Sequence, residues 1–310
     1  MRDRGAGRIG IWALGIAALA AVLAAVLTSA SGGGSSGGGK ASARASSRSA
    51  AASLKLSAYK SSDAPGFKVA TTMTETISPP NSNAVTVDIT LKGSMNPSAR
   101  TGGMTMNMQV PTGGGSTENL DMQEVLDGNT VYVKMPAALM GRVPGGKPWV
   151  SIDLAQMGKT VGLPGLGSAF NGTSNLTSAG EYLDFLRATS DGSVKDLGQQ
   201  TLDGRQVTLY SADADLAKVP SAVPAADKAG VTQMIAAFKS KGLSTQMPIE
   251  AWIDSANLIR RIQLTYNTSL QGASVAMDIT EDFSDYGPQP TPTAPSPDQT
   301  MSIAALQHHG

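Results

Sequence analysis

Side chains that could perform nucleophilic or acid–base chemistry are scarce in this chain. Cysteine is absent, and the two histidines, His308 and His309, lie within the last three residues. This excludes a thiol nucleophile, a buried Ser-His-Asp triad and a metal site rich in cysteine and histidine. Four aspartates could be paired as acids, but they match no catalytic spacing and are interpreted as solvated loop carboxylates: Asp191, Asp196, Asp213 and Asp215. We therefore expect no enzymatic activity, no cofactor and no metal.

The charge composition excludes a further class of function. Lysine plus arginine equals aspartate plus glutamate at 24 each, and charged residues make up only 15% of the chain. A long basic patch is missing and aromatic residues are few at 5%, so nucleic-acid binding is not expected. The 35 glycines suit a protein with many turns, and the 14 methionines suit a soft apolar core or cavity.

The N-terminal region has the pattern of an exported protein. Residues 1–8 are basic, and residues 9–27 contain no charge and are long enough to cross a hydrocarbon core of about 30 Å. The basic start predicts a cytoplasmic N-terminus and an extracytoplasmic remainder. Two interpretations stay open. Residues 9–27 form a transmembrane anchor that tethers the protein to the outer face of the membrane, or a signal peptide that is cleaved after Ala30 to release it.

Composition divides the rest of the chain into three parts. Residues 28–53 are rich in Gly, Ser and Ala and predict a flexible linker. Residues 54–287 predict the folded domain. Residues 288–310 are polar and rich in Pro, which predicts a disordered tail.

Period-two alternation of apolar and polar residues dominates the folded domain and predicts about eleven strands. The strands from Met247 to Tyr286 are expected to close one edge of the sheet. Trp252 is out of phase with Ile253, so it faces the other side or the rim of a cavity. Helices are predicted at Ser178–Ala188 and Pro224–Lys241. The alternating segments are 67–77, 85–91, 104–110, 120–126, 130–135, 149–154, 194–199, 205–211, 249–253, 258–267 and 272–286.

The short turns between these strands favour antiparallel neighbours, so we expect a mainly β, α+β protein built on one wide curved sheet. Two or more helices would cover its concave side. Two helices supply far fewer large apolar side chains than the sheet. The excess either packs on itself as an ordinary core or leaves an apolar cavity, and the pattern alone leaves both alternatives open.

Several short stretches resemble actinobacterial envelope lipoproteins of the LppX/LprG type, within the wider LolA-like group: Asp127–Lys134, Lys147–Asp153, Leu197–Arg205, Ala251–Asp254, Leu258–Arg261 and Asp282–Gly287. The resemblance implies an antiparallel half-barrel that holds helices, with a lipid-sized cavity between them. One departure is clear. Family members carry a lipid-modified cysteine where this chain has Ser31, so only residues 9–27 could hold it to a membrane.

With the resemblance, the expected function is non-enzymatic binding and carriage of lipids or lipoglycans in the cell envelope, with an envelope transport partner. The alternative is a tethered interaction or sensor module of the same fold that carries no ligand. Fifteen apolar residues are predicted to line the cavity: Val87, Ile89, Met104, Met106, Met108, Val131, Val133, Leu183, Leu186, Met234, Phe238, Ile262, Leu264, Val275 and Met277.

Overall fold

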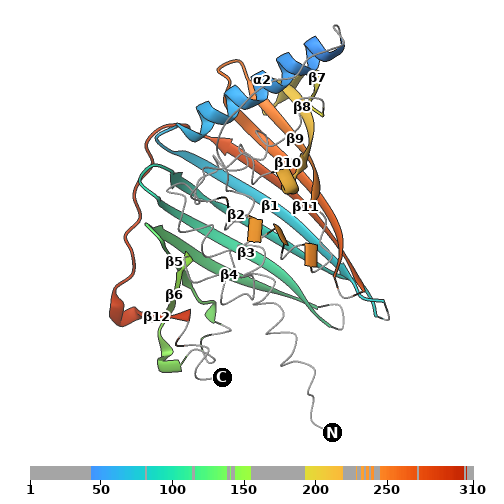
Figure 1. Ribbon diagram of the computed structural model, residues 1–310. Coiled ribbons are helices and arrows are strands. Elements are labelled where there is room, and N and C mark those ends of the chain that lie inside the picture. Colours follow the sequence, from blue (N-terminus) through green and yellow to red (C-terminus); the bar gives the residue numbers. More distant parts are fainter. Residues whose placement is uncertain are drawn as a thin grey trace.

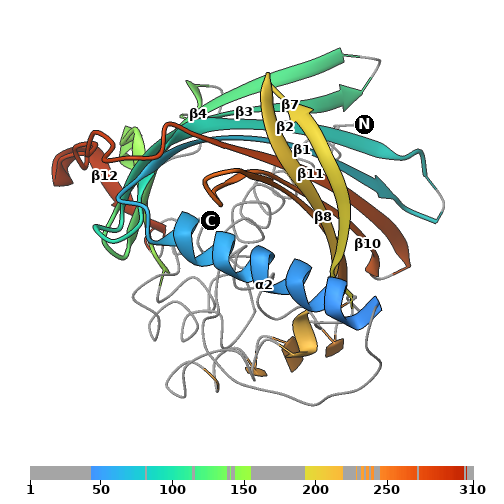
Figure 2. The same ribbon diagram turned by 90° about the horizontal axis from the view of Figure 1, so that it is seen from above.

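A single curved sheet of twelve strands forms the body of the protein, and helix α2 lies across its concave side (Figures 1 and 2). The computed structural model describes residues 43–80, 82–113, 116–137, 140, 144–154, 193–218, 228, 232–233, 235–236, 239–240, 245–270, 272–303 and 305. The elements in chain order are α2 Ala43–Ser62, β1 Phe67–Ser78, β2 Val85–Asn96, β3 Thr101–Gly113, β4 Ser116–Asp127, β5 Thr130–Lys134, β6 Trp149–Asp153, β7 Lys195–Leu202, β8 Arg205–Asp215, β9 Gln246–Asp254, β10 Ile259–Leu270, β11 Ala273–Ser284 and β12 Thr300–Ser302, with short 3-10 turns at Pro144–Gly146, Leu216–Lys218 and Pro297–Gln299.

The order of the strands in the sheet is β12-β6-β5-β4-β3-β2-β1-β11-β10-β9-β8-β7. Neighbours are antiparallel except β12 and β6, which are parallel. The mainly β, curved antiparallel architecture predicted from the sequence is therefore confirmed. The placement of β9, β10 and β11 at an edge is wrong, because β1 pairs with β11 from Lys68↔Ser284 to Ser78↔Ser274. The edges of the sheet are β12 and β7.

Local sequence explains the tight turns. β7 and β8 are joined by Asp203 and Gly204, whose φ angles of 49° and 77° are both positive. Such a two-residue turn matches the right-handed twist of the flanking strands, and glycine adopts its second position without strain. The hairpin predicted around Asp203-Gly204 is confirmed.

Helix α2 corrects the predicted linker. Residues 43–53 belong to the helix rather than to a flexible segment, because alanine favours a helix as strongly as glycine opposes it. Small residues also form the packed side of α2: Ala50, Ala51 and Ala58 are at most 3% exposed, and Leu54 lies between them. The helix ends shortly before Pro65, which cannot continue it.

The predicted disordered tail is wrong for the part of it that the structure describes. Asn96 bonds to both backbone groups of Gln289, with Nδ2 donating to the carbonyl oxygen at 3.0 Å and Oδ1 accepting from the amide at 2.9 Å. Lys147 Nζ then donates to the carbonyl oxygens of Pro297 and Thr300, and β12 adds to β6. The chain after β11 thus runs to the edge of the sheet at β6 and adds β12 there (Figure 1). This is the twelfth strand, where about eleven were expected.

The predicted helices are observed only in part. In the predicted helix at Pro224–Lys241, the described residues from 228 to 240 are helical, and Ile235 is 5% exposed and belongs to the main core. The predicted helix at Ser178–Ala188 and the predicted anchor at residues 9–27 lie outside the described residues. Within the described part of the chain, no helix has the length and apolarity needed to span a membrane.

Candidate functional site

The concave face of the sheet carries the apolar series of nearly every strand. Cross-strand register sets these side chains in continuous rows, for example from Met73 of β1 to Ile89 of β2 and Met108 of β3. The same face receives α2, whose buried alanines and Leu54 belong to the same core cluster. This concave face is the candidate site that the sequence predicted.

Eleven of the fifteen predicted lining residues are described, and their strand register places all eleven on the concave face. Seven are buried at 8% exposure or less: Val87, Ile89, Met106, Met108, Ile262, Leu264 and Met277. Four are only partly buried: Met104, Val131, Val133 and Val275. Leu183, Leu186, Met234 and Phe238 lie outside the described residues. The shared concave position of the eleven described residues does not test whether their side chains bind a ligand. Ligand binding by these residues stays a prediction.

Accessible apolar surface is concentrated at one side of the concave face. Met104 and Met122 on β3 and β4 are partly exposed, as are Val131 and Val133 on β5 and Ile152 on β6. The main contacts of α2 are instead with β7, β9 and β10. The strands opposite α2 therefore present apolar side chains that water still reaches.

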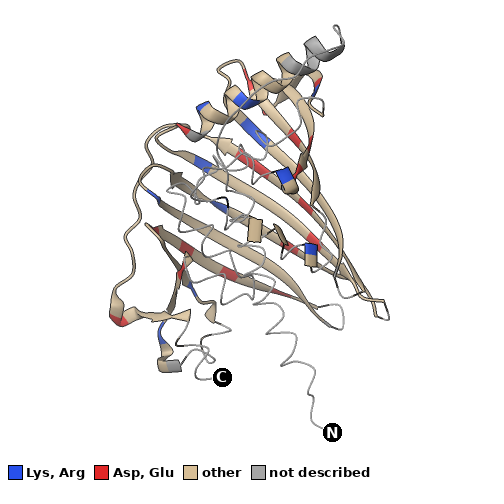
Figure 3. Ribbon diagram, viewed as in Figure 1, with Lys and Arg blue, Asp and Glu red and all other residues tan. Residues whose placement is uncertain are grey.

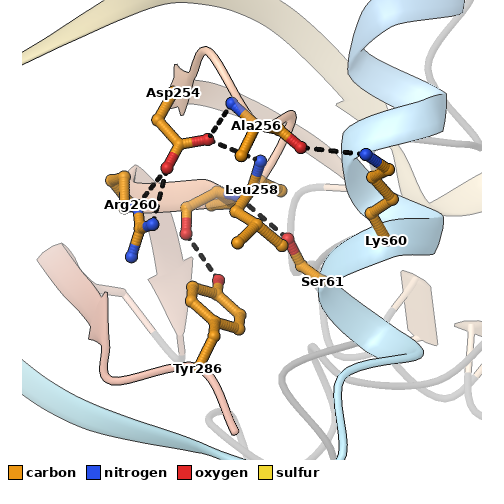
Figure 4. A network of polar contacts seen from close by, with 8 residues as sticks. Lys60, Ser61, Asp254, Ala256, Leu258, Arg260 and Tyr286 are labelled. Carbon is orange, nitrogen blue, oxygen red and sulfur yellow. Dashed lines mark hydrogen bonds and ion pairs between the residues drawn. The ribbon is translucent and has the colours of Figure 1, made fainter.

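A polar network fixes α2 to the sheet (Figure 4). Ser61 Oγ accepts a hydrogen bond of 2.9 Å from the amide of Ile259, and Tyr286 Oη donates to the Ile259 carbonyl oxygen at 2.5 Å. Burial raises the pKa of the Tyr286 hydroxyl, so it stays protonated and remains a donor. In addition, Lys60 Nζ donates to the Ala256 carbonyl oxygen at 3.1 Å. These bonds hold the C-terminal turn of α2 against the hairpin between β9 and β10.

Asp254 organises that hairpin. Its Oδ1 accepts hydrogen bonds of 2.9 Å from the amides of Ala256 and Leu258, which shape the turn. Its Oδ2 lies 2.6 Å from Arg260 Nη2, and both side chains are nearly buried, at 11% and 13% exposure. The Arg260 guanidinium also lies 5.1 Å from the centre of the Tyr286 ring, so the ion pair and the aromatic ring support each other.

Three glutamates with a raised pKa interrupt the apolar rows of the concave face: Glu75 of β1, Glu124 of β4 and Glu281 of β11. Burial raises the pKa of Glu75, and it raises the pKa of Glu124 from 4.5 to about 7. It raises the pKa of Glu281 from 4.5 to about 8, while the Thr71 hydroxyl lowers this pKa by donating to Oε1 at 3.5 Å. Burial therefore opposes ionisation of all three carboxyls, and the Glu281 carboxyl stays largely protonated at neutral pH.

Sequence reasoning missed these three residues, although their spacing contained the signal. Glu75 stands in phase with Met73 and Ile77, and Glu281 stands in phase with Ile279 and Phe283. Counting every second residue places each on the apolar face of its strand. A period-two count that included acidic residues would have found them.

The convex face has a different chemistry. There, several aspartates are paired across the ladder, as Asp121 is with Asn107 and Asp282 with Arg261. Trp252 also lies on the convex side, in a small separate cluster with Val207 and Leu209, and its Nε1 donates to Gln200 Oε1 at 3.1 Å. Of the two positions expected for Trp252, the structure shows the other side of the sheet. Figure 3 marks the charged positions of the sheet.

No group of three or more His, Asp or Glu side chains able to hold a metal ion occurs among the described residues. The arrangement offers apolar surface, carboxyls whose pKa burial raises, and methionine sulfurs. It can take up an apolar chain and donate or accept a few hydrogen bonds.

Comparison with known proteins gives structural neighbours only. No family model and no curated protein sequence matches the chain. Similar solved structures include LprF from Mycobacterium bovis, with 17% identity over 80% of this chain and 97% of that one and a TM-score of 0.39. The lipoprotein LppX from Mycobacterium tuberculosis has 13% identity over 79% and 98%, with a TM-score of 0.38.

A LolA superfamily protein from Nitrosomonas europaea is also similar, with 10% identity over 78% of this chain and 94% of that one and a TM-score of 0.25. The neighbours thus include LppX and a LolA superfamily protein, the kinds of protein that the sequence motifs resemble. With identities and TM-scores this low, the function proposed below rests on the residues of this chain.

Proposed function

We propose that this chain binds lipids or lipoglycans without chemical catalysis and carries them in the bacterial cell envelope. The acyl chains lie against the concave face of the sheet. The observation that carries the proposal is the partly exposed apolar series on β3–β6, which includes Met104, Met122 and Val133. Removing acyl chains from water onto such a surface contributes about 0.8 kcal/mol per methylene group, so binding needs few polar contacts.

The methionines of β3 suit varied ligands. Met104, Met106 and Met108 lie in one concave series, and their unbranched side chains adapt to different shapes at low cost. Residues 9–27 would tether the domain at the outer face of the cytoplasmic membrane, or release it if they are cleaved. At that location the apolar face would meet envelope lipids and a transport partner.

A matched pair of substitutions on β3 tests the proposal. Met106→Trp fills the concave side, whereas Thr105→Trp adds the same bulk to the exposed convex side. We expect Met106→Trp to lower the lipid content of the purified protein severalfold, measured by mass spectrometry of an organic extract, and Thr105→Trp to leave it unchanged.

Because overfilling a packed core costs about 1–3 kcal/mol, Val133→Trp provides a second concave variant at a position that is only partly buried. The unfolding midpoint of each variant, followed by circular dichroism, separates loss of fold from loss of ligand. Unchanged lipid content in both folded concave variants would contradict the proposed site.

A further inference from the structure

Glu75 is a buried carboxyl for which the described residues provide no partner. Its exposure is 2%, and among the described residues no hydrogen bond or ion pair reaches it. Its cross-strand neighbours are Val87 and Met277, and Met73 precedes it on the same face, all at 4% exposure or less. A sheet that needed only a packed core would place an apolar residue here, because a buried polar group without a partner is unfavourable.

Glu281 is a second carboxyl on this face with an unsatisfied oxygen. Its Oε2 is buried and has no hydrogen-bond partner, while Oε1 accepts only the 3.5 Å contact from Thr71. Glu75 stands opposite Met277, four residues before Glu281 on β11. At about 3.4 Å per residue, the two backbone positions are roughly 14 Å apart along the face.

The charges around these carboxyls limit what could meet them. No Lys or Arg stands in the concave series of β1–β6, β8, β9 or β11. At the bulge of β10, the guanidinium of Arg260 is already bound to Asp254. A phosphate on this face would find acidic groups and no free cation among the described strands. A hydroxyl group can both donate and accept hydrogen bonds, so it satisfies a carboxyl in either protonation state.

We propose that Glu75 and Glu281 are specificity-determining residues that select amphiphiles carrying uncharged hydroxyl groups over those carrying an anionic phosphate. This inference rests on the proposed lipid-binding function and adds the chemical class of the ligand. The hydroxyl can belong to the head group or to the acyl chain. Glu75, which is surrounded by buried apolar side chains, suits a hydroxyl that enters with a chain.

Two pairs of probes distinguish these sources. Methyl stearate and a mid-chain hydroxystearate methyl ester differ only in a chain hydroxyl, while dioleoylglycerol and dioleoyl phosphatidate differ in the head group. Dissociation constants are measured by displacement of a fluorescent fatty-acid ester from the full chain. We expect the hydroxyl-bearing member of at least one pair to bind roughly three- to tenfold more tightly, as one additional hydrogen bond predicts.

Three variants connect that preference to the two carboxyls. Glu75→Leu and Glu281→Leu should each reduce the preference, with methyl stearate bound as well as before, whereas Glu75→Gln retains a donor and an acceptor and should keep it. Glu250→Leu on the convex face is the matched control and should leave all four constants unchanged. Thermal midpoints verify that each variant folds, and Glu75→Leu should raise the midpoint because it removes an unpartnered buried carboxyl.

The outcomes distinguish failure of this inference from failure of the proposed lipid-binding function. If no probe binds the wild-type chain, the proposed function fails. If all four probes bind equally, if phosphatidate binds more tightly than dioleoylglycerol, or if the preference survives in both leucine variants, lipid binding stands and the role of Glu75 and Glu281 is wrong.

Discussion

Carboxyl groups lie on both faces of this sheet, and the two sets differ in their partners. On the convex face, Asp88 accepts a hydrogen bond of 2.8 Å from Thr74, Asp278 one of 2.9 Å from Thr265, and Asp282 one of 2.5 Å from Arg261. On the concave face, Glu75 and Glu281 stand in apolar rows, and Glu281 Oε2 has no partner.

This difference predicts opposite effects on stability when a carboxyl is removed from one face or the other. The convex aspartates are short side chains that pair across the ladder near water, where such pairs stabilise the sheet modestly. Of the two concave glutamates, Glu281 has only the 3.5 Å contact from Thr71, and burial opposes the ionised form of both. Removing a paired carboxyl should therefore destabilise the protein, and removing an unpaired one should stabilise it. The sign of the change tests the comparison directly.

The largest effect is expected at Asp254. Asp254→Ala leaves the nearly buried Arg260 guanidinium without its carboxylate and removes the acceptor for two turn amides. We expect the free energy of unfolding in urea to fall by about 3–5 kcal/mol. A loss below about 1 kcal/mol would show that the network of Figure 4 behaves like a surface ion pair.

Glu281→Gln should have the opposite sign, and its effect should depend on pH. Burial raises the pKa of Glu281 from 4.5 to about 8, so between these values the folded chain keeps a proton that the unfolded chain has released. Wild-type stability therefore falls as the pH rises through this window, by at most about 1.4 kcal/mol per pH unit. The variant cannot ionise, so its advantage should be greatest above the upper value.

Urea unfolding of Glu281→Gln and wild type at about pH 5 and about pH 9 measures this difference. Glu250→Gln, on the convex face, is the matched control and should follow the wild type at both values. An advantage of Glu281→Gln that is equal at both pH values would mean that the Glu281 carboxyl is not held neutral by burial.

The smallest effect is expected at Asp282. Its side chain is 37% exposed, and that of its partner Arg261 is 27% exposed. Asp282→Ala should cost no more than about 1 kcal/mol, and high salt should reduce that cost further. A larger, salt-independent loss would remove the contrast between the convex pairs and the buried pair at Asp254.

The period-two pattern predicted much of this fold because it records which face of each strand is buried. It predicted the antiparallel strands, the Asp203-Gly204 turn and the concave position of all eleven described candidate residues. Counting every second residue in the same way would have placed Glu75 and Glu281 on the apolar face as well. Those residues were overlooked because acidic residues are normally assigned to the solvated face.

The rest depends on contacts that local sequence does not encode. The tail is ordered by Asn96 and Lys147, which precede its backbone partners by more than a hundred residues. Its Pro-rich composition predicts disorder only in the absence of such partners. Similarly, the alanines that begin α2 could belong to a linker or to a helix, and their packing against the sheet decides for the helix.

The central claim is that the concave face of the sheet holds an acyl lipid. The most direct test is to purify the full chain from a bacterial envelope under native conditions, extract it with organic solvent and quantify the extract by mass spectrometry. The account predicts close to stoichiometric acyl lipid, reduced in Met106→Trp and retained in Thr105→Trp. A reproducibly empty extract from the folded protein would contradict it and favour an interaction module without a ligand.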